Sequence, residues 1–350
     1  MIEKILAFAV EKILSYAKKQ NCSDVHISTG SPPMMRIDGN MTSVPGSSPL
    51  TENQVLEMIT SILTDNQKKI YETQLELDFS IQIGDDLRFR VNAFRTISGP
   101  AAVFREIPNS IRTLSDLHTP EVVRELSNLK KGLVLVVGPT GSGKSTTLAA
   151  LIDHINSNKS MHIITIEDPV EFVHKNKKSM INQREVGNST LSFASALKSA
   201  LREDPDVILV GELRDVETIQ LALTAAETGH LVLGTMHTNS SAQAINRIID
   251  VFHADDKAVI RSMLSTSIRA VVSQRLLKKE GGGRCAVYEV MIANASIRNL
   301  IREDKIPQIN SIMELGKKAG MCTMKDSITE LLEKGFISKE TADESLIANE

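Results

Sequence analysis

The chain changes its pattern of apolar and polar positions near residue 110. Close to the amino terminus, apolar side chains recur every three or four residues, which predicts an amphipathic helix with one core-facing stripe: Ile2, Ile5, Leu6, Ala9, Ile13 and Leu14. Short strands are predicted over residues 23–28 and 33–41, the second with a turn at Asp38 and Gly39. A second helix is predicted after Thr51, because Thr51 and Gln54 form a capping box.

Strict alternation of apolar and polar residues follows and predicts a half-buried β-hairpin. One face is apolar at Leu75, Leu77, Phe79, Ile81 and Ile83, and after a turn at residues 84–86 the pattern resumes at Leu87, Phe89, Val91 and Ala93. The other face of the returning strand carries Arg88 and Arg90, and a third predicted strand ends at Arg105. Three arginines are therefore expected on or near one polar sheet surface. From the pattern alone, a solvated outer face is the simpler interpretation.

Residues 107–120 contain two prolines and little periodicity, and they predict the boundary between two domains. We therefore expect a first domain at residues 1–106, a linker at 107–120 and a second domain at 121–350. The second part alternates continuous apolar runs with helical stretches, which is typical of an α/β fold with a parallel sheet covered by helices on both faces. The runs are residues 132–138, 162–166, 207–210 and 231–234.

Each of the four apolar runs ends in residues capable of chemistry. A glycine-rich loop follows the first run, Glu167 and Asp168 the second, Glu212 the third and His237 the fourth. Because the carboxyl ends of parallel strands meet at one edge of a sheet, where ligands collect, these four endings are expected to share one crevice.

The loop after the first run fits G-x-x-x-x-G-K-[ST], the phosphate-binding P-loop. It follows a predicted strand and opens a predicted helix, as a P-loop requires. The expected nucleotide-binding residues are Gly138, Pro139, Thr140, Gly141, Ser142, Gly143, Lys144, Ser145 and Thr146. Backbone N–H groups would face phosphate oxygens, Lys144 would reach the β and γ phosphates, and Ser145 would hold Mg²⁺.

Hydrolysis also needs a group that orients or deprotonates water, and either Glu167 or Glu212 is suited to this role. Taken alone, each glutamate would more often cap a helix or form an ion pair. Their position after buried strands beside a P-loop favours a functional role. His230 and His237 flank the fourth run; a structural histidine is the simpler interpretation, although an imidazole there could contact the γ phosphate. Their spacing, without a nearby third ligand, does not support a zinc site.

The composition argues against a protein that mainly binds nucleic acid, a disulfide-rich protein and a membrane-spanning protein. There are 40 Lys and Arg against 43 Asp and Glu, a formal charge of −3, and only 3% aromatic residues, which argues against nucleic acid as the main partner. Cys22, Cys285 and Cys322 offer neither a disulfide framework nor a CxxC metal pair, so a reducing cytosol is expected. No apolar run approaches the roughly 18 residues needed for a transmembrane segment.

Several stretches resemble motifs of the secretion ATPase superfamily of type II secretion and type IV pili. Residues 201–215, LREDPDVILVGELRD, resemble its signature stretch, while TIEDPVEF, GPTGSGKST and TGHLVLGTMHTN resemble its Asp box, Walker A motif and His box. SIRNLIRE, residues 296–303, is similar to the AIRNLIRE motif of the PilT-like retraction ATPases of twitching motility, with Ser296 in place of alanine. Assembly ATPases usually carry a four-cysteine metal finger that this chain lacks. A PilU-like accessory role or an assembly role is the alternative.

The resemblance implies an ATP-hydrolysing, Mg²⁺-dependent hexameric ring in which a PAS-like amino-terminal domain precedes a RecA-like domain. It implies that Arg88, Arg90 and Arg105 reach the nucleotide, that Glu167 activates water and that Glu212 is the Walker B acid near Mg²⁺. It also implies a cytoplasmic location, peripheral at the inner membrane, with an inner-membrane pilus platform protein and possibly a second retraction ATPase as partners.

Two other functions stay open from the residues alone. The first is a P-loop kinase or GTPase, although residues 176–179 match the guanine-reading N-K-x-D motif without its final acid. The second is a nucleotide-sensing assembly protein that binds ATP and hydrolyses it negligibly.

Overall fold

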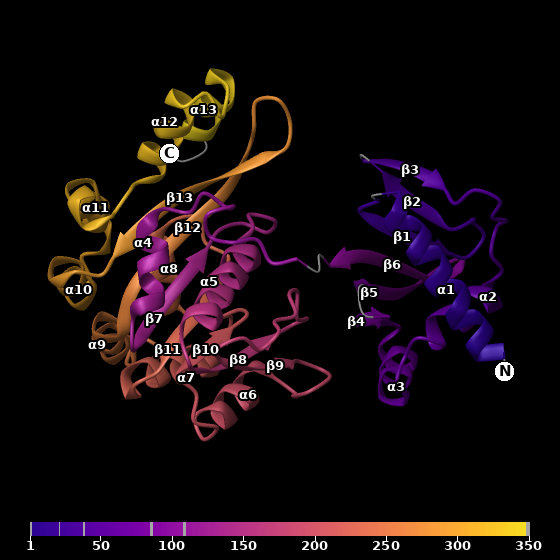
Figure 1. Cartoon of the computed structure of the whole chain (residues 1–350). Helices are drawn as coiled ribbons and strands as arrows, with labels where there is room; N and C mark the ends of the chain where they lie inside the picture. Colours follow the sequence, from indigo (N-terminus) through magenta and orange to yellow (C-terminus); the bar gives the residue numbers. More distant parts are fainter. Residues whose placement is uncertain (1, 21, 38, 85–86, 108–109, 348–350) are drawn as a thin grey trace. The chain divides into compact units, whose positions relative to one another are not determined.

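The computed structural model describes residues 2–20, 22–37, 39–84, 87–107 and 110–347. The chain forms two compact units, one ending at Ser110 and the other beginning at Ile111 (Figure 1). This division falls inside the predicted linker. Leu114 is only 2% exposed and packs in the core of the second unit, so this part of the expected linker belongs to that unit.

In its described residues, the first unit is a six-stranded antiparallel sheet with three helices (Figure 1). The strand order is β3-β2-β1-β6-β5-β4. The strands are β1 (Asp24–Ser28), β2 (Met34–Ile37), β3 (Asn40–Ser43), β4 (Glu76–Ile83), β5 (Leu87–Thr96) and β6 (Gly99–Ile107). The helices are α1 (Ile2–Lys19), α2 (Glu52–Thr60) and α3 (Asp65–Gln74).

The local predictions that fall on described residues of this unit are confirmed, with two corrections. The Thr51 capping box opens α2, and the alternating segment forms the β4–β5 hairpin. The expected place of Leu75 in the hairpin is wrong: Leu75 ends α3 with a left-handed backbone (φ 64°) and is 51% exposed. Helix α3 itself was not predicted. The expected turn residues Asp38, Asp85 and Asp86 lie outside the described residues.

The core of the first unit forms where α1 and α2 cover the sheet. Apolar positions of α1 and α2 pack with alternate residues of the strands, including Leu14, Val55, Phe89 and Phe104. The side chains of residues 2–8, part of the predicted stripe on α1, lie outside the described residues. The opposite face of β5 carries the polar residues, as the alternation predicted.

The second unit is built on a seven-stranded sheet with the order β13-β12-β7-β11-β10-β8-β9. Its strands are β7 (Gly132–Val137), β8 (His162–Glu167), β9 (Met180–Glu185), β10 (Val207–Val210), β11 (Leu231–Met236), β12 (Ile268–Lys278) and β13 (Arg284–Ile292). All neighbouring pairs are parallel except β12 and β13, which form an antiparallel hairpin. The parallel sheet predicted from the apolar runs is therefore confirmed.

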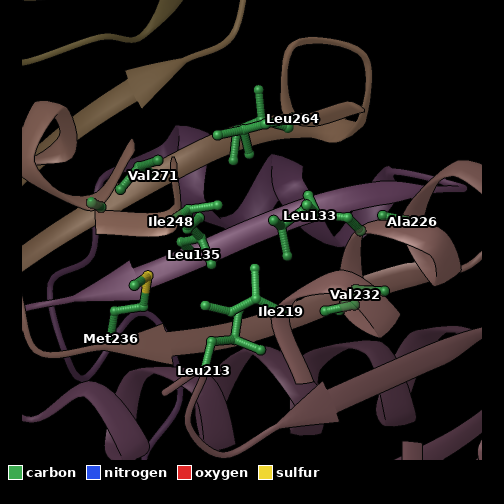
Figure 2. Close-up of a cluster of buried hydrophobic side chains, with 14 of the residues drawn as sticks. Leu133, Leu135, Leu213, Ile219, Ala226, Val232, Met236, Ile248, Leu264 and Val271 are labelled. Atoms are coloured by element: carbon green, nitrogen blue, oxygen red, sulfur yellow. The ribbon is translucent and has the colours of Figure 1, made fainter. Parts of the chain in front are cut away.

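Helices cover both faces of this sheet, as the continuous apolar runs predicted. Leu133, Leu135 and Val137 of β7 face one core, and Val134 and Val136 face the other. Figure 2 shows the first core, where side chains of β7 and β11 point toward those of the covering helices. The helices on that side are α6 (Phe193–Ala200), α7 (Val216–Thr228), α8 (Ser241–Asp250), α9 (Lys257–Ser267), α10 (Ala295–Arg302) and α11 (Ile309–Leu315).

The other face is covered by α4 (Glu121–Glu125) and α5 (Lys144–Asn158). The chain continues into α12 (Met324–Glu333) and α13 (Lys339–Ile347), which pack beside the β12–β13 hairpin around a small separate core. Within the part of the chain that the structure describes, no helix combines the length and apolarity that crossing a membrane requires.

Candidate functional site

The carboxyl ends of four adjacent strands place the glycine-rich loop, Glu167, Glu212 and His237 at one edge of the second sheet. Strands β7, β11, β10 and β8 are consecutive and parallel. The glycine-rich loop follows β7, Glu167 is the last residue of β8, Glu212 follows β10 and His237 follows β11. Leu213 N–H donates to the Thr235 carbonyl at 2.9 Å, which ties the segment after β10 to the end of β11.

The glycine-rich loop packs so closely on β12 that two of its glycines leave no room for a side chain. Gly138 has a φ of 150°, and a Cβ there would overlap the backbone carbonyl of Gln274. Gly143 has a φ of 88°, and a Cβ there would lie 2.9 Å from Nε2 of Gln274. Both positions therefore need glycine for backbone conformation and for space.

Lys144 and Ser142 provide donors suited to an anion at the amino terminus of α5. Lys144 is 8% exposed, and its Nζ donates to the carbonyl oxygens of Gly138 at 2.8 Å and Pro139 at 3.0 Å. Burial lowers the pKa of Lys144, against the opposing effect of Glu212 and Glu171. The Ser142 hydroxyl is buried and has no hydrogen-bond partner among the described residues. A phosphate group would satisfy both side chains and the backbone N–H groups of the helix terminus.

Glu212 is held as an anion beside the loop. Its carboxylate lies 2.6 Å from Nε of Arg214 and 3.3 Å from Nε2 of His237. Burial opposes ionisation, but the hydrogen bond from Arg214 and the nearby His237 hold the pKa of Glu212 below its ordinary value. The other ring nitrogen of His237 lies 3.4 Å from the Thr140 hydroxyl. His237 therefore connects the Glu212 carboxylate to the glycine-rich loop.

The pKa of Glu167 is shifted in the opposite direction to that of Glu212. Burial raises the pKa of Glu167 to about 7, although hydrogen bonds favour its ionised form. Its Oε1 accepts from the Thr165 hydroxyl at 2.7 Å and from Nε2 of Gln183 at 3.3 Å. A carboxyl group with a pKa near neutrality is suited to accept a proton from water.

Ser145 and Glu212 are the residues expected to hold magnesium. Their hydroxyl and carboxylate oxygens are the hard donors that Mg²⁺ prefers, and Mg²⁺ keeps several waters and uses phosphate oxygens as further ligands. No cluster of three or more His, Cys, Asp and Glu side chains that could hold a metal occurs among the described residues. The donors present therefore fit a magnesium ion that arrives with a nucleotide.

His230 does not share this edge. Its carbonyl accepts from the N–H of Gly132 at 3.0 Å, and its Nδ1 lies 3.0 Å from the carbonyl of Ala225. Gly132 begins β7, whereas the glycine-rich loop follows the last residue of that strand. A six-residue strand separates the two edges by roughly 20 Å. The expectation that His230 contacts a phosphate at the loop of its own chain is therefore wrong.

The three predicted arginines lie together on the polar face of the first unit. Arg90 pairs directly with Arg105 across β5 and β6, and Arg88 is two residues along the same face. Arg105 Nε donates to the Asp24 carboxylate at 2.8 Å, and Arg88 donates to the Ser80 hydroxyl at 2.9 Å. The Arg105 side chain is nevertheless 71% exposed. The first unit therefore presents a guanidinium group to solvent beside a second one.

Gln274 is the main site residue that the sequence analysis missed. It lies on β12, is 2% exposed and hydrogen-bonds Ser142 and Thr147. The polar residues 273–275 interrupt the apolar residues 270–272 and 276–277 of this strand, and this interruption was the available signal. Arg214 and Gln183, the partners of Glu212 and Glu167, were missed as well.

A cavity of about 1010 Å³ begins beside the glycine-rich loop. Gly143 and Thr146 are among its lining residues, together with Leu276 and Tyr288 of the β12–β13 hairpin. Residues 116–120 also contribute to the lining. The cavity offers room for a group attached to a phosphate bound at the loop.

The fold and the site define an α/β protein with a glycine-rich loop of the phosphate-binding pattern and two carboxylates at the same edge of its sheet. The chain belongs to the family described as "Type II/IV secretion system protein", whose model matches residues 2–344. It is 53% identical over 335 residues to the type IV pilus retraction ATPase PilT of Pseudomonas aeruginosa, covering 96% of this chain and 97% of that protein. It is 52% identical to a twitching motility protein of Neisseria gonorrhoeae, covering 96% and 90% of the two chains.

A solved structure is also similar to this chain. The crystal structure of the pilus retraction motor PilT with bound ADP matches with a TM-score of 0.89 at 46% identity, covering 96% of each chain. Because the match spans nearly the whole chain, both units share the arrangement of elements found in that motor.

Proposed function

We propose that this chain is a subunit of an ATP-hydrolysing motor that powers type IV pilus retraction in twitching motility. The observation that carries the proposal is the gathering of the glycine-rich loop, Glu167 and Glu212 at one edge of the second sheet. The similarity to retraction ATPases over nearly the whole chain supports the biological role. We further propose that the first unit is PAS-like, that the second is RecA-like and that six subunits form a ring.

The nucleotide phosphates bind at the loop between β7 and α5. Lys144 exchanges the carbonyl oxygens of Gly138 and Pro139 for β and γ phosphate oxygens, and the buried Ser142 hydroxyl gains a partner. The nucleoside extends past Thr146 into the adjacent cavity.

The Ser145 hydroxyl and the ionised Glu212 carboxylate would hold the magnesium ion. Magnesium, when bound, would offset the negative charge that develops in phosphoryl transfer. Arg214 and His237 keep Glu212 ionised and fixed in orientation. The carboxylate is thus ready to act as a metal ligand or as a ligand to metal-bound water.

Glu167 accepts the proton of the attacking water. The water oxygen bonds to the γ phosphorus while the bond from this phosphorus to the β–γ bridging oxygen breaks, which gives ADP and phosphate. The proton stays on the Glu167 carboxyl until it passes to solvent or phosphate. Its pKa near 7 lets the same group take up and release the proton at neutral pH.

Arginines of the first unit complete the site. The guanidinium groups of Arg88, Arg90 and Arg105 stabilise negative charge on the transferred phosphoryl group. His237, between Glu212 and Thr140, responds when the γ phosphate leaves. Binding and loss of that phosphate change the preferred arrangement of the two units, which delivers the mechanical step.

The work is delivered to an inner-membrane platform protein of the pilus, on whose cytoplasmic side the ring attaches peripherally. A second retraction ATPase can assist. A PilU-like accessory role or a role in assembly or secretion is the alternative and is separated by the second experiment below.

Phosphate release tests the enzymatic part of the proposal. The wild type should release phosphate from ATP without an added acceptor and should prefer ATP to GTP, whereas a kinase would need an acceptor. Lys144→Ala and Glu212→Ala should lose at least about 100-fold in kcat, because both groups act on charge in the transition state. Equal background rates in all three proteins would favour the nucleotide-sensing assembly protein instead.

Deletion of the gene tests the biological part. Cells should become hyperpiliated and lose twitching, and the wild-type gene should restore both properties while Lys144→Ala should not. Cells without pili would favour an assembly role. Cells that are hyperpiliated but still twitch would favour an accessory retraction role.

A further inference from the structure

Gln274 connects the glycine-rich loop to helix α5 through both ends of its amide. Nε2 donates to the Ser142 carbonyl at 2.9 Å, and Oε1 accepts from the Thr147 hydroxyl at 2.7 Å. The side chain is 2% exposed, so these bonds are made away from water. A displacement of the loop relative to α5 would leave one end of a buried amide without a partner.

Tyr288 extends this connection across the neighbouring strand. It stands directly opposite Gln274 in the β12–β13 pair, and both side chains are only 2% exposed. The Tyr288 hydroxyl donates to the carbonyl of Leu117 at 3.4 Å. Burial raises the pKa of Tyr288 to about 12, so the hydroxyl keeps its proton at neutral pH.

Leu117 belongs to the segment that begins the second unit. This unit starts at Ile111, so residues 111–120 are the first part of the unit after the junction with the other. The segment is organised by its own hydrogen bonds, from the N–H of Leu117 to Thr113, from that of His118 to Ser115 and from that of Thr119 to Leu114. Gln274 and Tyr288 therefore lie side by side, the first bonded to the glycine-rich loop and the second to a structured segment next to the junction.

We propose that Gln274 and Tyr288 are positioning residues that transmit phosphate binding at the glycine-rich loop to residues 111–120. Occupation of the loop fixes the Ser142 carbonyl, and the series Ser142, Gln274, Tyr288 and Leu117, in which Gln274 and Tyr288 are a buried cross-strand pair, then holds the segment at the junction in one arrangement. The inference rests on the proposed function only in requiring that the loop binds phosphate. It adds a route by which the nucleotide state reaches the start of the second unit.

Amide hydrogen exchange of the full chain with magnesium pyrophosphate tests this route. Pyrophosphate is the probe because it occupies the loop without a nucleoside that could touch residues 116–120 in the adjacent cavity. In the wild type, it should slow exchange both at residues 138–146 and at residues 113–119. The effect on the second set should be about threefold to tenfold, the worth of one hydrogen bond.

Tyr288→Phe removes one hydroxyl from the middle of the series. It should keep protection at residues 138–146 and lose it at residues 113–119. Tyr71→Phe is the matched control, because Tyr71 is also a buried tyrosine whose hydroxyl donates to a carbonyl at 3.4 Å, but it lies in the first unit. Protection of residues 113–119 by pyrophosphate that is the same in Tyr288→Phe as in the wild type would overturn the inference.

A second variant tests whether the two residues act in series. Gln274→Met keeps a similar volume and removes both amide hydrogen bonds, so it too should lose protection at residues 113–119. The double variant with Tyr288→Phe should lose no more than either single variant. Additive losses would contradict a single series.

The failures of the two proposals are distinguishable. If pyrophosphate gives no protection at residues 138–146 of the wild type, the loop does not bind phosphate and the proposed function is wrong. If it protects these residues but not residues 113–119, the inference alone is wrong.

Discussion

Glu167→Gln is expected to stabilise the nucleotide-free protein while it abolishes hydrolysis. Burial raises the pKa of Glu167 from its ordinary 4.5 to about 7. At about 1.4 kcal/mol per pKa unit, this shift corresponds to about 3 kcal/mol of folding free energy lost when the carboxyl ionises. Glutamine cannot ionise, and its carbonyl oxygen can still accept from Thr165 and Gln183.

The direction of the pH dependence follows because the folded state binds the Glu167 proton more tightly than the unfolded state does. The folded state holds the Glu167 proton up to about pH 7, whereas the unfolded state releases it near pH 4.5. Stability of the wild type therefore falls as pH rises through this window and is fully reduced above about pH 7. Glu167→Gln has no carboxyl to ionise, so its free energy of unfolding does not fall in this window. It should exceed that of the wild type by about 3 kcal/mol at pH 8 and by less than about 1 kcal/mol at pH 5.

Urea unfolding of nucleotide-free protein at pH 5 and pH 8 measures the difference, read from the transition of the second unit. Glu125→Gln, at an exposed position of the same unit, is the control, and its free energy of unfolding should change little at either pH.

Phosphate release by Glu167→Gln should fall at least about 100-fold. The kcat of the wild type should rise about tenfold from pH 6 to pH 8. A variant that is less stable than the wild type at pH 8, or equally stabilised at both pH values, would refute the reasoning.

Three further predictions concern the loop, the arginines and α10. Gly138→Ala should weaken ADP binding at least about tenfold by calorimetry, because its Cβ overlaps Gln274, whereas Gly141→Ala, with no atom within 4 Å of the new Cβ, should have a smaller effect. Arg90→Ala should retain ADP binding but lose turnover, and mixing it with Lys144→Ala subunits should restore part of the phosphate release; no restoration would count against shared sites. Ile301→Asp should unfold the second unit, because Ile301 is fully buried, and native circular dichroism at 25 °C would contradict this.

The sequence predicted features that depend on neighbouring residues. The Thr51 capping box and the β4–β5 hairpin follow from local hydrogen bonding and from alternation, and both appear in the structure. The four apolar runs likewise became adjacent parallel strands with the glycine-rich loop, Glu167 and Glu212 at their ends. Their positions directly after strands of a parallel sheet were enough to predict that these groups lie at the same edge.

Two errors had signals that were available. His230 precedes β11, and a residue before a parallel strand lies at the opposite edge from the residues that follow it. Helix α3 buries only Tyr71, so it lacks an apolar period, but Thr64 and Gln67 form a capping box at its start. Leu75 fits the alternating pattern by sequence, yet it ends this helix.

Gln274 makes a contact that local sequence patterns cannot predict. Its partner Ser142 is 132 residues away, and the contact arises only because β12 lies beside β7 in the sheet. The raised pKa of Glu167 likewise depends on burial by packed residues that no spacing rule identifies. Sequence motifs therefore predicted the reactive groups. Their pKa values and the hydrogen bonds that hold them depend on tertiary packing, which motifs do not describe.

The most direct test of the central claim is a crystal structure of the full chain with a non-hydrolysable ATP analogue and Mn²⁺, with the metal located by its anomalous signal. The account predicts one peak next to the Ser145 hydroxyl on the Glu212 side of the terminal phosphates, with the Glu167 carboxyl facing the γ phosphate. A metal bound elsewhere, or a Glu167 carboxyl turned away from that phosphate, would contradict it.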